Sequence, residues 1–191
     1  MKRKTSKPQP RSRRRKQADS PRVSSPPPPH LGGYPIRAAR LADAAVIARF
    51  NRAMASETEA RKLSPSRVLR GVKALLADPG KGAYYVAESG GKVIGQLLIT
   101  FEWSDWRNGN FWWIQSVFVT PEHRGRGVFK ALHAHIEQLA RSRRDICGLR
   151  LYVDAHNTKA KEVYARLGLS PTHYELWETD FVLRSGGSTP D

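Results

Sequence analysis

The sequence predicts one mixed α/β domain of the α+β type, in which about four helices flank a mostly antiparallel sheet of six to seven strands. Two observations predict it. Apolar residues recur with a period of two in some segments and with helical spacing in others, and the segments follow the order strand, two helices, three strands, helix, strand, helix, strand. The three consecutive strands have no helix between them, which favours antiparallel pairing in the first half of the sheet.

The first half of the domain begins with a short strand and two helices, which a hairpin follows. Asp43 lies near the start of the first helix, and Ser64 with Pro65 opens the second, because a serine N-cap and a proline at the first helical position both favour helix initiation. The turn "SGGK" separates two runs of strand-forming residues, which is typical of a hairpin. The predicted elements are a strand at 34–39, helices at 41–55 and 64–78, and strands at 83–88 and 93–101.

The second half continues with a polar and aromatic loop and then alternates strands with helices. The third helix begins near Gly127, and the fourth ends at Gly168, a residue type that is common just past a helix end. The predicted elements are a loop at 102–110, a strand at 111–119, the third helix, a strand at 149–153, a helix at 157–168 and one or two strands within 173–183. One face of the third helix is predicted to hold Val128, Ala131, Leu132, His135, Ile136 and Leu139.

The charge of the chain is concentrated at its start. The chain of 191 residues has 33 Lys and Arg against 17 Asp and Glu, and residues 1–33 contain ten of the basic residues and one of the acids. Because this segment is also rich in Pro and Ser and poor in apolar side chains, it is predicted to be disordered, as is the short end at 184–191. The basic segment could be a nuclear address, an arm for weak nonspecific nucleic-acid contact, a transit peptide or a solvated tail.

Two further features of the composition bear on the expected cellular location of the protein. No apolar run is long enough to span a membrane, so no membrane partner is expected. Cys147 is the single cysteine, which excludes an intramolecular disulfide and favours a reducing compartment. The expected location is the cytoplasm, or the nucleus if the source is eukaryotic, and the protein is expected to be a monomer or a homodimer.

The stretch "VTPEHRGRGVFKAL" joins the fourth strand to the third helix and has the features of a phosphate site. The first N–H groups of a helix have no partner within the helix, and Gly125 and Gly127 lack the Cβ atoms that would keep a ligand from the backbone. Arg124, Arg126 and Lys130 add positive charge beside them. This combination favours a phosphate or pyrophosphate ligand. Neither a P-loop nor a dinucleotide fingerprint occurs at the required spacing.

The segment Arg124, Gly125, Arg126, Gly127, Val128, Phe129 resembles the acetyl-CoA motif of the GNAT superfamily of N-acetyltransferases. That motif reads Arg or Gln, two residues, Gly, one residue, and Gly or Ala, so Phe129 departs from it, and its ring is expected to turn away from the pyrophosphate. A second motif of the family is matched downstream by Asn157, Ala160, Tyr164 and Gly168. The two motifs and the order of elements imply a GNAT-like acetyltransferase domain over residues 34–183.

The resemblance also implies how the cosubstrate, acetyl-CoA, would be held. The fourth strand would end in a bulge and diverge from the fifth, and the backbone of Val117, Phe118 and Val119 would pair with pantetheine. The Val119 N–H would stabilise the oxyanion, and Tyr164 would protonate the departing thiolate. The expected cofactor contacts are Val117, Phe118, Val119, Arg124, Gly125, Arg126, Gly127, Val128, Phe129, Lys130, Asn157, Ala160 and Tyr164. No metal is expected.

The general base is less well defined by the sequence. Many members of the family have a Glu or Asp where this chain has Gln115 and Ser116, neither of which holds a proton at neutral pH. These two residues could instead position a water that relays the proton to a more distant carboxylate. Glu102 is the preferred candidate, and the others are Glu57, Glu59 and Asp105.

The acceptor is predicted to be a primary amine of a small molecule, such as a polyamine, a diamine or an amino-acid derivative. Acids beside indole rings suit an ammonium group through charge and cation–π attraction. The expected acceptor contacts are Glu57, Glu59, Glu102, Trp103, Asp105, Trp106 and Gln115. Two alternatives stay open: a protein N-acetyltransferase with an open groove for a peptide, and a catalytically inactive fold that binds nucleic acid through its tail.

Overall fold

A computed structural model describes residues 33–182 of the chain. The predicted basic tail, apart from Gly33, and the predicted flexible end at 184–191 lie outside the described residues. Within residues 33–182, no helix has both the length and the apolar character needed to cross a membrane.

The elements follow the predicted order through the fourth helix. The first half contains β1 (Ile36–Ala38), a 3-10 turn (Leu41–Asp43), α1 (Ala44–Glu59), α2 (Pro65–Leu76), β2 (Ala83–Ser89) and β3 (Lys92–Ser104). The second half contains β4 (Gly109–Val119), a 3-10 turn (Pro121–His123), α3 (Val128–Arg141), β5 (Ile146–Leu151) and α4 (Thr158–Arg166). The expected N-cap of α2 is present, because the Ser64 side chain accepts a hydrogen bond from the Arg67 backbone N–H.

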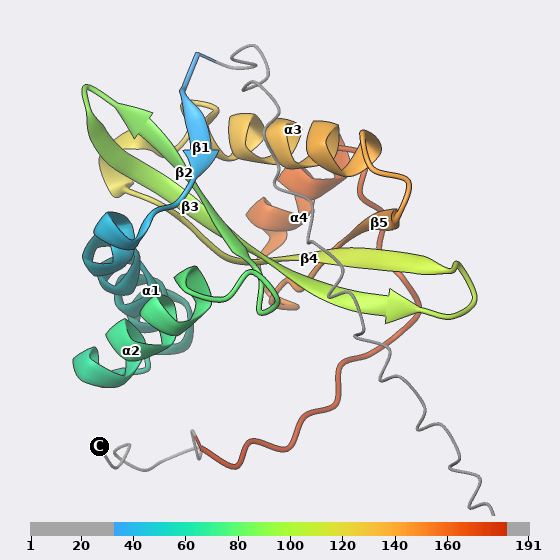
Figure 1. Ribbon diagram of the computed structural model, residues 1–191, viewed down its shortest axis with the longest axis horizontal. Helices are drawn as coiled ribbons and strands as arrows, with labels where there is room; N and C mark the ends of the chain where they lie inside the picture. The colour runs from blue at the N-terminus through green and yellow to red at the C-terminus, as the bar shows by residue number, and fades with distance from the viewer. Residues whose placement is uncertain (1–32, 183–191) are drawn as a thin grey trace, which may run out of the picture.

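The five strands form one sheet in the order β1-β2-β3-β4-β5. Neighbouring strands are antiparallel from β1 to β4, and β5 joins β4 in parallel after the crossover through α3. The predicted mixed α/β domain with a mostly antiparallel sheet is therefore confirmed. Figure 1 shows α3 on one side of the sheet and the pair α1 and α2 on the other.

Each side of the sheet has its own apolar core. On the α3 side, Leu97, Ile99 and Trp112 pack against Leu132 and Ile136. On the side of α1 and α2, another cluster contains Ile47, Val72, Tyr84, Val86 and Leu98. Because side chains of a strand alternate between its faces, the two clusters fix which residues of β3 and β4 face each helical layer.

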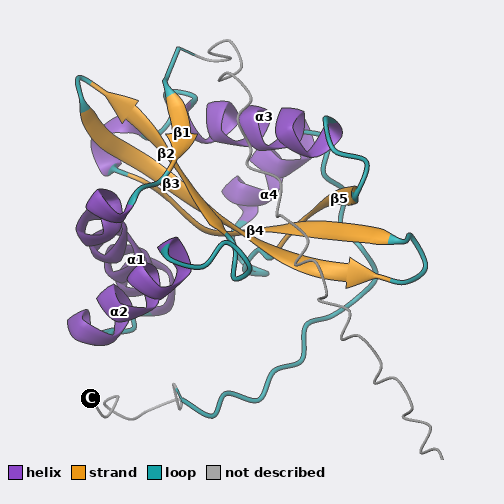
Figure 2. Cartoon of the chain, viewed as in Figure 1, coloured by secondary structure: helices purple, strands orange, loops and turns teal. Residues whose placement is uncertain are grey.

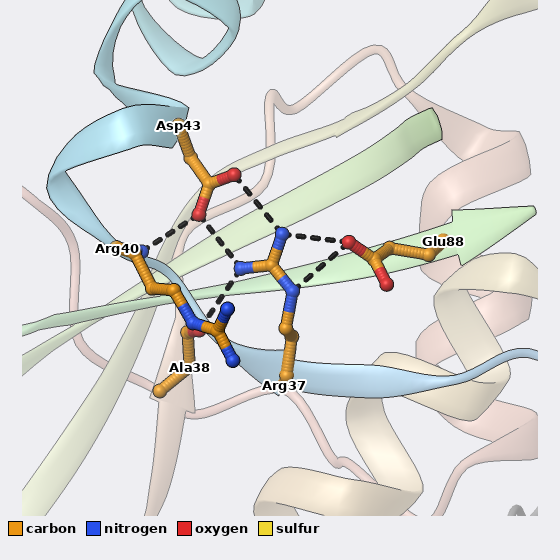
Figure 3. Close-up of polar contacts among 5 residues, drawn as sticks. All are labelled: Arg37, Ala38, Arg40, Asp43 and Glu88. Atoms are coloured by element: carbon orange, nitrogen blue, oxygen red, sulfur yellow. Dashed lines mark hydrogen bonds and ion pairs between the residues drawn. The ribbon is translucent and has the colours of Figure 1, made fainter. Parts of the chain in front are cut away.

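An arginine of the first strand holds the start of the domain together. Arg37 donates two hydrogen bonds to the carboxylate of Asp43, at 2.7 and 3.0 Å, and its Nη2 lies 2.6 Å from Glu88 of β2 (Figure 3). Asp43 also accepts the Arg40 backbone N–H. These bonds tie the 3-10 turn that leads into α1 to the edge of the sheet.

The segment predicted as a loop at 102–110 is instead the far end of a long hairpin. β3 continues to Ser104 and pairs with Gly109, so that only residues 105–108 form the turn. Asn108 has a φ of 46°, a conformation that asparagine tolerates better than most residues, and it allows the tight reversal. Beyond the helices, β3 and β4 run on as a projecting pair of strands (Figure 2).

The strands predicted within 173–183 are not found in the part that the structure describes, which ends at Val182. The sheet therefore has five strands among the described residues instead of six or seven. The apolar side chains of this segment are exposed, including Tyr174, Leu176, Trp177 and Phe181. A strand requires a hydrogen-bonding partner, and a period-two pattern in the sequence does not supply one.

Candidate active site

The strand β4 contains a bulge next to its C-terminal end. The β3–β4 register shifts between Gln96 and Leu98, so that Leu97 is opposite two residues, Ser116 and Val117. Ser116 has a φ of 48°, in the left-handed region. The extra residue reverses the alternation of side chains, so that Val117 and Val119 pack toward the α3 core.

β4 and β5 pair over only part of their length. The last paired residues are Ile114 and Leu151, while β4 continues to Val119. One edge of residues 115–119 is therefore not paired with β5, and this edge is called the β4 slot below. An extended ligand could add to such an edge through main-chain hydrogen bonds.

The direction of the backbone N–H groups along the slot follows from one hydrogen bond. The Thr120 N–H donates to the Ile94 carbonyl of β3 at 2.9 Å. Because successive N–H groups of a strand point to opposite edges, the N–H groups of Val117 and Val119 point away from β3 and toward the slot. The sequence analysis assigned the Val119 N–H to the oxyanion and the backbone of 117–119 to pantetheine.

The phosphate loop, defined as residues 124–130, connects β4 to α3. Gly125 and Gly127 have φ values of 72° and 83°, which L side chains rarely adopt, and a Cβ added at either would meet no atom within 4 Å. Gly127 is the N-cap of α3, so the N–H groups of the first turn point out of the helix end. The loop is open to a ligand, and Arg126 and Lys130 are exposed beside it.

One arginine of this loop already has a partner. Nη2 of Arg124 lies 2.7 Å from the carboxylate of Glu57 on α1, and its Nε donates to the Val119 carbonyl at 2.9 Å. Glu57 and Arg124 thus lie at the slot, where the sequence analysis expected an acceptor contact and a cofactor contact. Their ion pair neutralises both side chains.

The second family motif lies on α4 and reaches the phosphate loop through an aromatic contact. The rings of Phe129 and Tyr164 meet edge to face with their centroids 5.7 Å apart, so the Phe129 ring packs toward α4. Burial raises the pKa of the Tyr164 phenol, which keeps it protonated at neutral pH. Asn157 is the N-cap of α4, and its side chain accepts the Ala160 N–H at 3.0 Å.

A cluster on the α1 side of the sheet surrounds Glu102. One carboxylate oxygen accepts a hydrogen bond from Trp113 and the other lies 2.7 Å from Arg150. Burial raises the pKa of Glu102, but the hydrogen bonds from these two side chains outweigh it and leave the pKa below its ordinary value. Trp113 also stacks on the exposed Tyr152 ring at 4.4 Å. Both oxygens of Glu102 are engaged, which is unfavourable for a general base.

Three of the predicted acceptor residues, Trp103, Asp105 and Trp106, lie away from the slot. Trp103 and Trp106 are exposed at the far end of the hairpin, where Asp105 accepts the Trp106 N–H. The tip begins seven residues before Ser116, at a distance of about 23 Å along the strand. Trp103 also lies on the opposite face of β3 from Glu102. The expected aromatic pocket is therefore not formed by these residues.

Two others of the predicted acceptor residues have local partners. Glu59 forms a 3.7 Å ion pair with Arg61 at the end of α1. Gln115 lies on the same face as Glu102 and donates to the Thr100 hydroxyl at 2.6 Å.

Sequence reasoning missed Trp113, Arg150 and Tyr152, which surround Glu102 on neighbouring strands. They belong to the same face because Trp113 is opposite Thr100 on β3 and Arg150 on β5. This register depends on the bulge and on the crossover through α3, and no local pattern in the sequence reveals either.

Comparison with known proteins agrees with this geometry. Residues 48–169 match the acetyltransferase (GNAT) family model. A solved structure of a possible acetyltransferase from Clostridium difficile 630 is 43% identical, with 78% of this chain and 99% of that chain covered and a TM-score of 0.73.

Two further matched proteins support less specific conclusions. A predicted acetyltransferase of Clostridium acetobutylicum, solved with acetyl-CoA, is 18% identical with a TM-score of 0.63, covers 76% of this chain and 96% of its own, and shows the fold alone. The mycothiol acetyltransferase of Kocuria rhizophila is 38% identical over 73 residues, which span 38% of this chain and only 22% of that relative. The family match covers most of the described domain, and the chain belongs to the acetyltransferase (GNAT) family.

Proposed function

We propose that the protein is an N-acetyltransferase that moves the acetyl group of acetyl-CoA to a primary amine of a small molecule. The amine attacks directly while both substrates are bound. The observation that carries the proposal is that the β4 slot and the phosphate loop are consecutive in the chain. A ligand with a diphosphate at one end and an extended amide chain at the other fits both.

The chain fits acetyl-CoA at the position where its diphosphate would bind. Gly125 and Gly127 leave open space that a Cβ would partly fill, and their positive φ values turn the following N–H groups outward. The N-terminal end of α3 favours negative charge. Arg126 and Lys130 add two cations, and Arg124 adds a third if it leaves Glu57.

Acetyl-CoA supplies an activated acetyl group as a thioester. The Val119 N–H would donate to the thioester oxygen as negative charge develops on it, and a preorganised donor of this kind contributes roughly 10²–10³ in rate. The Val117 N–H, one strand repeat away on the same edge, would donate to an amide carbonyl of pantetheine. Tyr164 would hold the proton that the leaving thiolate takes. Its raised pKa suits this role, because the phenol remains an acid throughout the neutral range.

The acceptor would approach from the side of the sheet on which α1 lies. The Trp113 and Tyr152 stack, together with the paired charges of Glu102 and Arg150, borders the slot on that side. We retain Glu102 as an acceptor contact and assign it no proton transfer, because both of its oxygens already accept hydrogen bonds.

A second candidate acceptor is the N-terminus of a polypeptide. It is favoured by one observation: the Trp103 and Trp106 side chains lie at the hairpin tip and do not enclose the slot. Tyr152, at its border, is 48% exposed. An open border of this kind admits a chain as well as a small amine.

Calorimetry with the Gly127→Glu variant tests the cosubstrate. The substitution places a side chain at a φ of 83° and a negative charge where the diphosphate would lie, so acetyl-CoA should release no measurable heat of binding. Gly90→Glu is the matched control, because Gly90 also has a positive φ and open space but lies in the β2–β3 turn. Wild-type affinity in the Gly127→Glu variant would refute the site.

A panel of amines and short peptides, with release of the CoA thiol as the readout, tests the acceptor. Turnover with primary amines and none with peptides is expected. Turnover only with peptides would replace the small-molecule proposal by the polypeptide alternative, and binding of acetyl-CoA without any turnover would refute the enzyme.

A further inference from the structure

Ser116 is held in an unusual backbone conformation. Within residues 33–182, three residues other than glycine have a positive φ, and the other two, Ala60 and Asn108, lie at a helix end and in a hairpin turn. Ser116 alone of these three lies inside a strand, at the bulge of β4. Such strain persists only where the surroundings impose it.

Three hydrogen-bonding side chains, those of Gln96, Asn51 and Tyr84, surround Ser116, and these four residues are called the Ser116 ring below. Gln96 Nε2 donates to the Ser116 carbonyl at 3.3 Å and to Asn51 Oδ1 at 2.6 Å. Asn51 Nδ2 donates to Tyr84 Oη at 2.9 Å. Burial raises the pKa of the Tyr84 phenol, and the Ser116 side chain also acts on this hydroxyl and lowers its pKa, with a smaller effect. The ring joins α1, β2, β3 and β4.

The ring lies in the interior, and Gln96 lowers the stability of the fold because it buries an acceptor atom without a partner in the described part of the chain. Gln96 has no exposed surface, and its Oε1 atom finds no hydrogen-bond partner among the described residues. A methionine or leucine would fill this volume without the unpaired Oε1 atom, but it would remove the donor to Asn51 Oδ1 and to the Ser116 carbonyl. Residues that break a local rule in this way are expected at functional sites.

We propose that Gln96, supported by Asn51 and Tyr84, is a positioning residue that holds the Ser116 bulge and so aims two N–H groups into the β4 slot, that of Val119 at the reacting thioester and that of Val117 at pantetheine. This inference rests on the proposed function. A trans peptide points its C=O and the next N–H in opposite directions. Drawing the Ser116 carbonyl toward Gln96 therefore turns the Val117 N–H away from the α1 layer.

The bulge also decides the direction of Val119. Without the extra residue, the alternation along β4 would shift by one position, and the N–H groups now at the slot would point toward β3. Ser116 relaxes toward a negative φ when the hydrogen bond from Gln96 to its carbonyl is removed, since a side chain disfavours the left-handed region. Loss of the ring thus misaligns the donors without altering the phosphate loop.

The first test compares turnover with cosubstrate binding in the Gln96→Met variant. The substitution keeps the volume and removes both hydrogen bonds. We expect kcat to fall about 10- to 100-fold, because misplacing a catalytic group by an ångström costs on this order. The calorimetric Kd for acetyl-CoA should change less than about threefold, since the phosphate loop is intact. Gln138→Met, an exposed glutamine on α3, is the chemically matched control with unchanged kcat.

The decisive arm is rescue by Ser116→Gly in the Gln96→Met background. Glycine adopts a positive φ as readily as a negative one, so the bulge should persist without the ring and kcat should recover at least about fivefold. A ring that only stabilises the core predicts no recovery. Tyr84→Phe, which removes a single oxygen atom, replaces Gln96→Met if that variant does not fold, and it should show the same loss and the same rescue.

A spectroscopic arm separates this inference from the proposed function. The amide resonances of Val117 and Val119 in the ligand-free protein should move in Gln96→Met or Tyr84→Phe and return when Ser116→Gly is added. This readout needs no turnover. If the protein acetylates no amine, the proposed function is refuted, but the amide resonances still test whether the Ser116 ring positions the bulge. Unmoved amides, kcat within twofold of wild type, or failure of the glycine rescue would each overturn the inference.

Discussion

At the scale of single residues, Tyr164 is the side chain whose chemistry can be isolated most cleanly. Its ring packs on Phe129 at the start of α3, and burial raises the pKa of its phenol. In the proposed reaction it would therefore act as an acid and not as a phenolate.

Replacing Tyr164 by phenylalanine should lower kcat about 10²-fold while the Kd for acetyl-CoA stays within about threefold, because a general acid contributes roughly 10²–10⁴ in rate. Steady-state kinetics with calorimetry on the same sample measures both quantities. Tyr34→Phe, at a tyrosine outside the site, serves as the control. Unchanged turnover in Tyr164→Phe would assign the proton to water.

Asp43 gives a prediction about stability. The hydrogen bonds from Arg37 hold the pKa of Asp43 below its ordinary value of 3.8, although burial opposes them. A carboxyl group whose folded pKa is depressed adds stability above its unfolded pKa, and this contribution is lost as the pH falls through the folded value.

The Asp43→Asn variant should therefore lose about 1–3 kcal/mol of unfolding free energy at pH 7, the usual cost of disrupting a partly buried charged hydrogen bond. The difference from wild type should shrink as the pH falls below about 4, because the wild-type carboxylate is then also neutralised. Urea unfolding across this pH range measures it. Asp145→Asn, which breaks an exposed pair with Arg143, should change stability by less than about 1 kcal/mol.

The two kinds of residue in the site were not equally predictable. Gly125 and Gly127 were predicted from the sequence, because a left-handed turn ahead of a helix has a local signature. Gln96 was not, and Ser116 was predicted only as a position for a relaying water, since the meeting of these two residues depends on a one-residue shift between strands. Polar residues in a strand do not disclose their partners across the sheet.

At the scale of elements, the contact between α1 and the phosphate loop has a functional consequence. Arg124 binds Glu57 in the ligand-free protein and would also be near the diphosphate of acetyl-CoA. The two anions compete for one guanidinium group.

Removing the competitor should tighten cosubstrate binding. Glu57→Gln is expected to lower the Kd for acetyl-CoA about two- to fivefold, because an exposed ion pair is worth at most about 1 kcal/mol. Glu59→Gln, two residues away on the same helix with Arg61 as its partner, should leave the Kd unchanged. Weaker binding in Glu57→Gln would mean that the pair holds the loop in its binding conformation.

Most elements could be derived from sequence periodicity, and the exceptions share a cause. The hairpin at 102–110 was read as a loop because its polar residues mask a pairing that Asn108 and Gly109 allow. Strands were predicted within 173–183 because local alternation was taken as sufficient. In both cases the outcome was decided by backbone pairing with another segment, which alternation within one segment does not reveal.

At the scale of the whole molecule, charge is divided between the tail and the domain. Residues 1–33 contain ten basic residues, whereas the rest of the chain has 23 basic and 16 acidic residues. We propose that any affinity for nucleic acid belongs to this segment and is electrostatic.

A chain shortened to residues 34–191 should bind acetyl-CoA as tightly as the full chain and lose its affinity for duplex DNA. Binding by the full chain should fall by roughly 10³-fold or more between 50 and 200 mM salt, in line with several phosphate contacts. Fluorescence anisotropy at several salt concentrations measures this dependence. Salt-independent DNA binding by the shortened chain would place a nucleic-acid site on the domain itself.

The edge of β4 that diverges from β5 also exposes the molecule to faulty self-association. A strand edge with apolar side chains such as Val117 and Val119 is a template on which a second chain can add by main-chain pairing. Arg124 occupies the Val119 carbonyl and sets a charged group at that edge. In the ligand-free protein, the same arginine therefore disfavours aggregation through this strand edge.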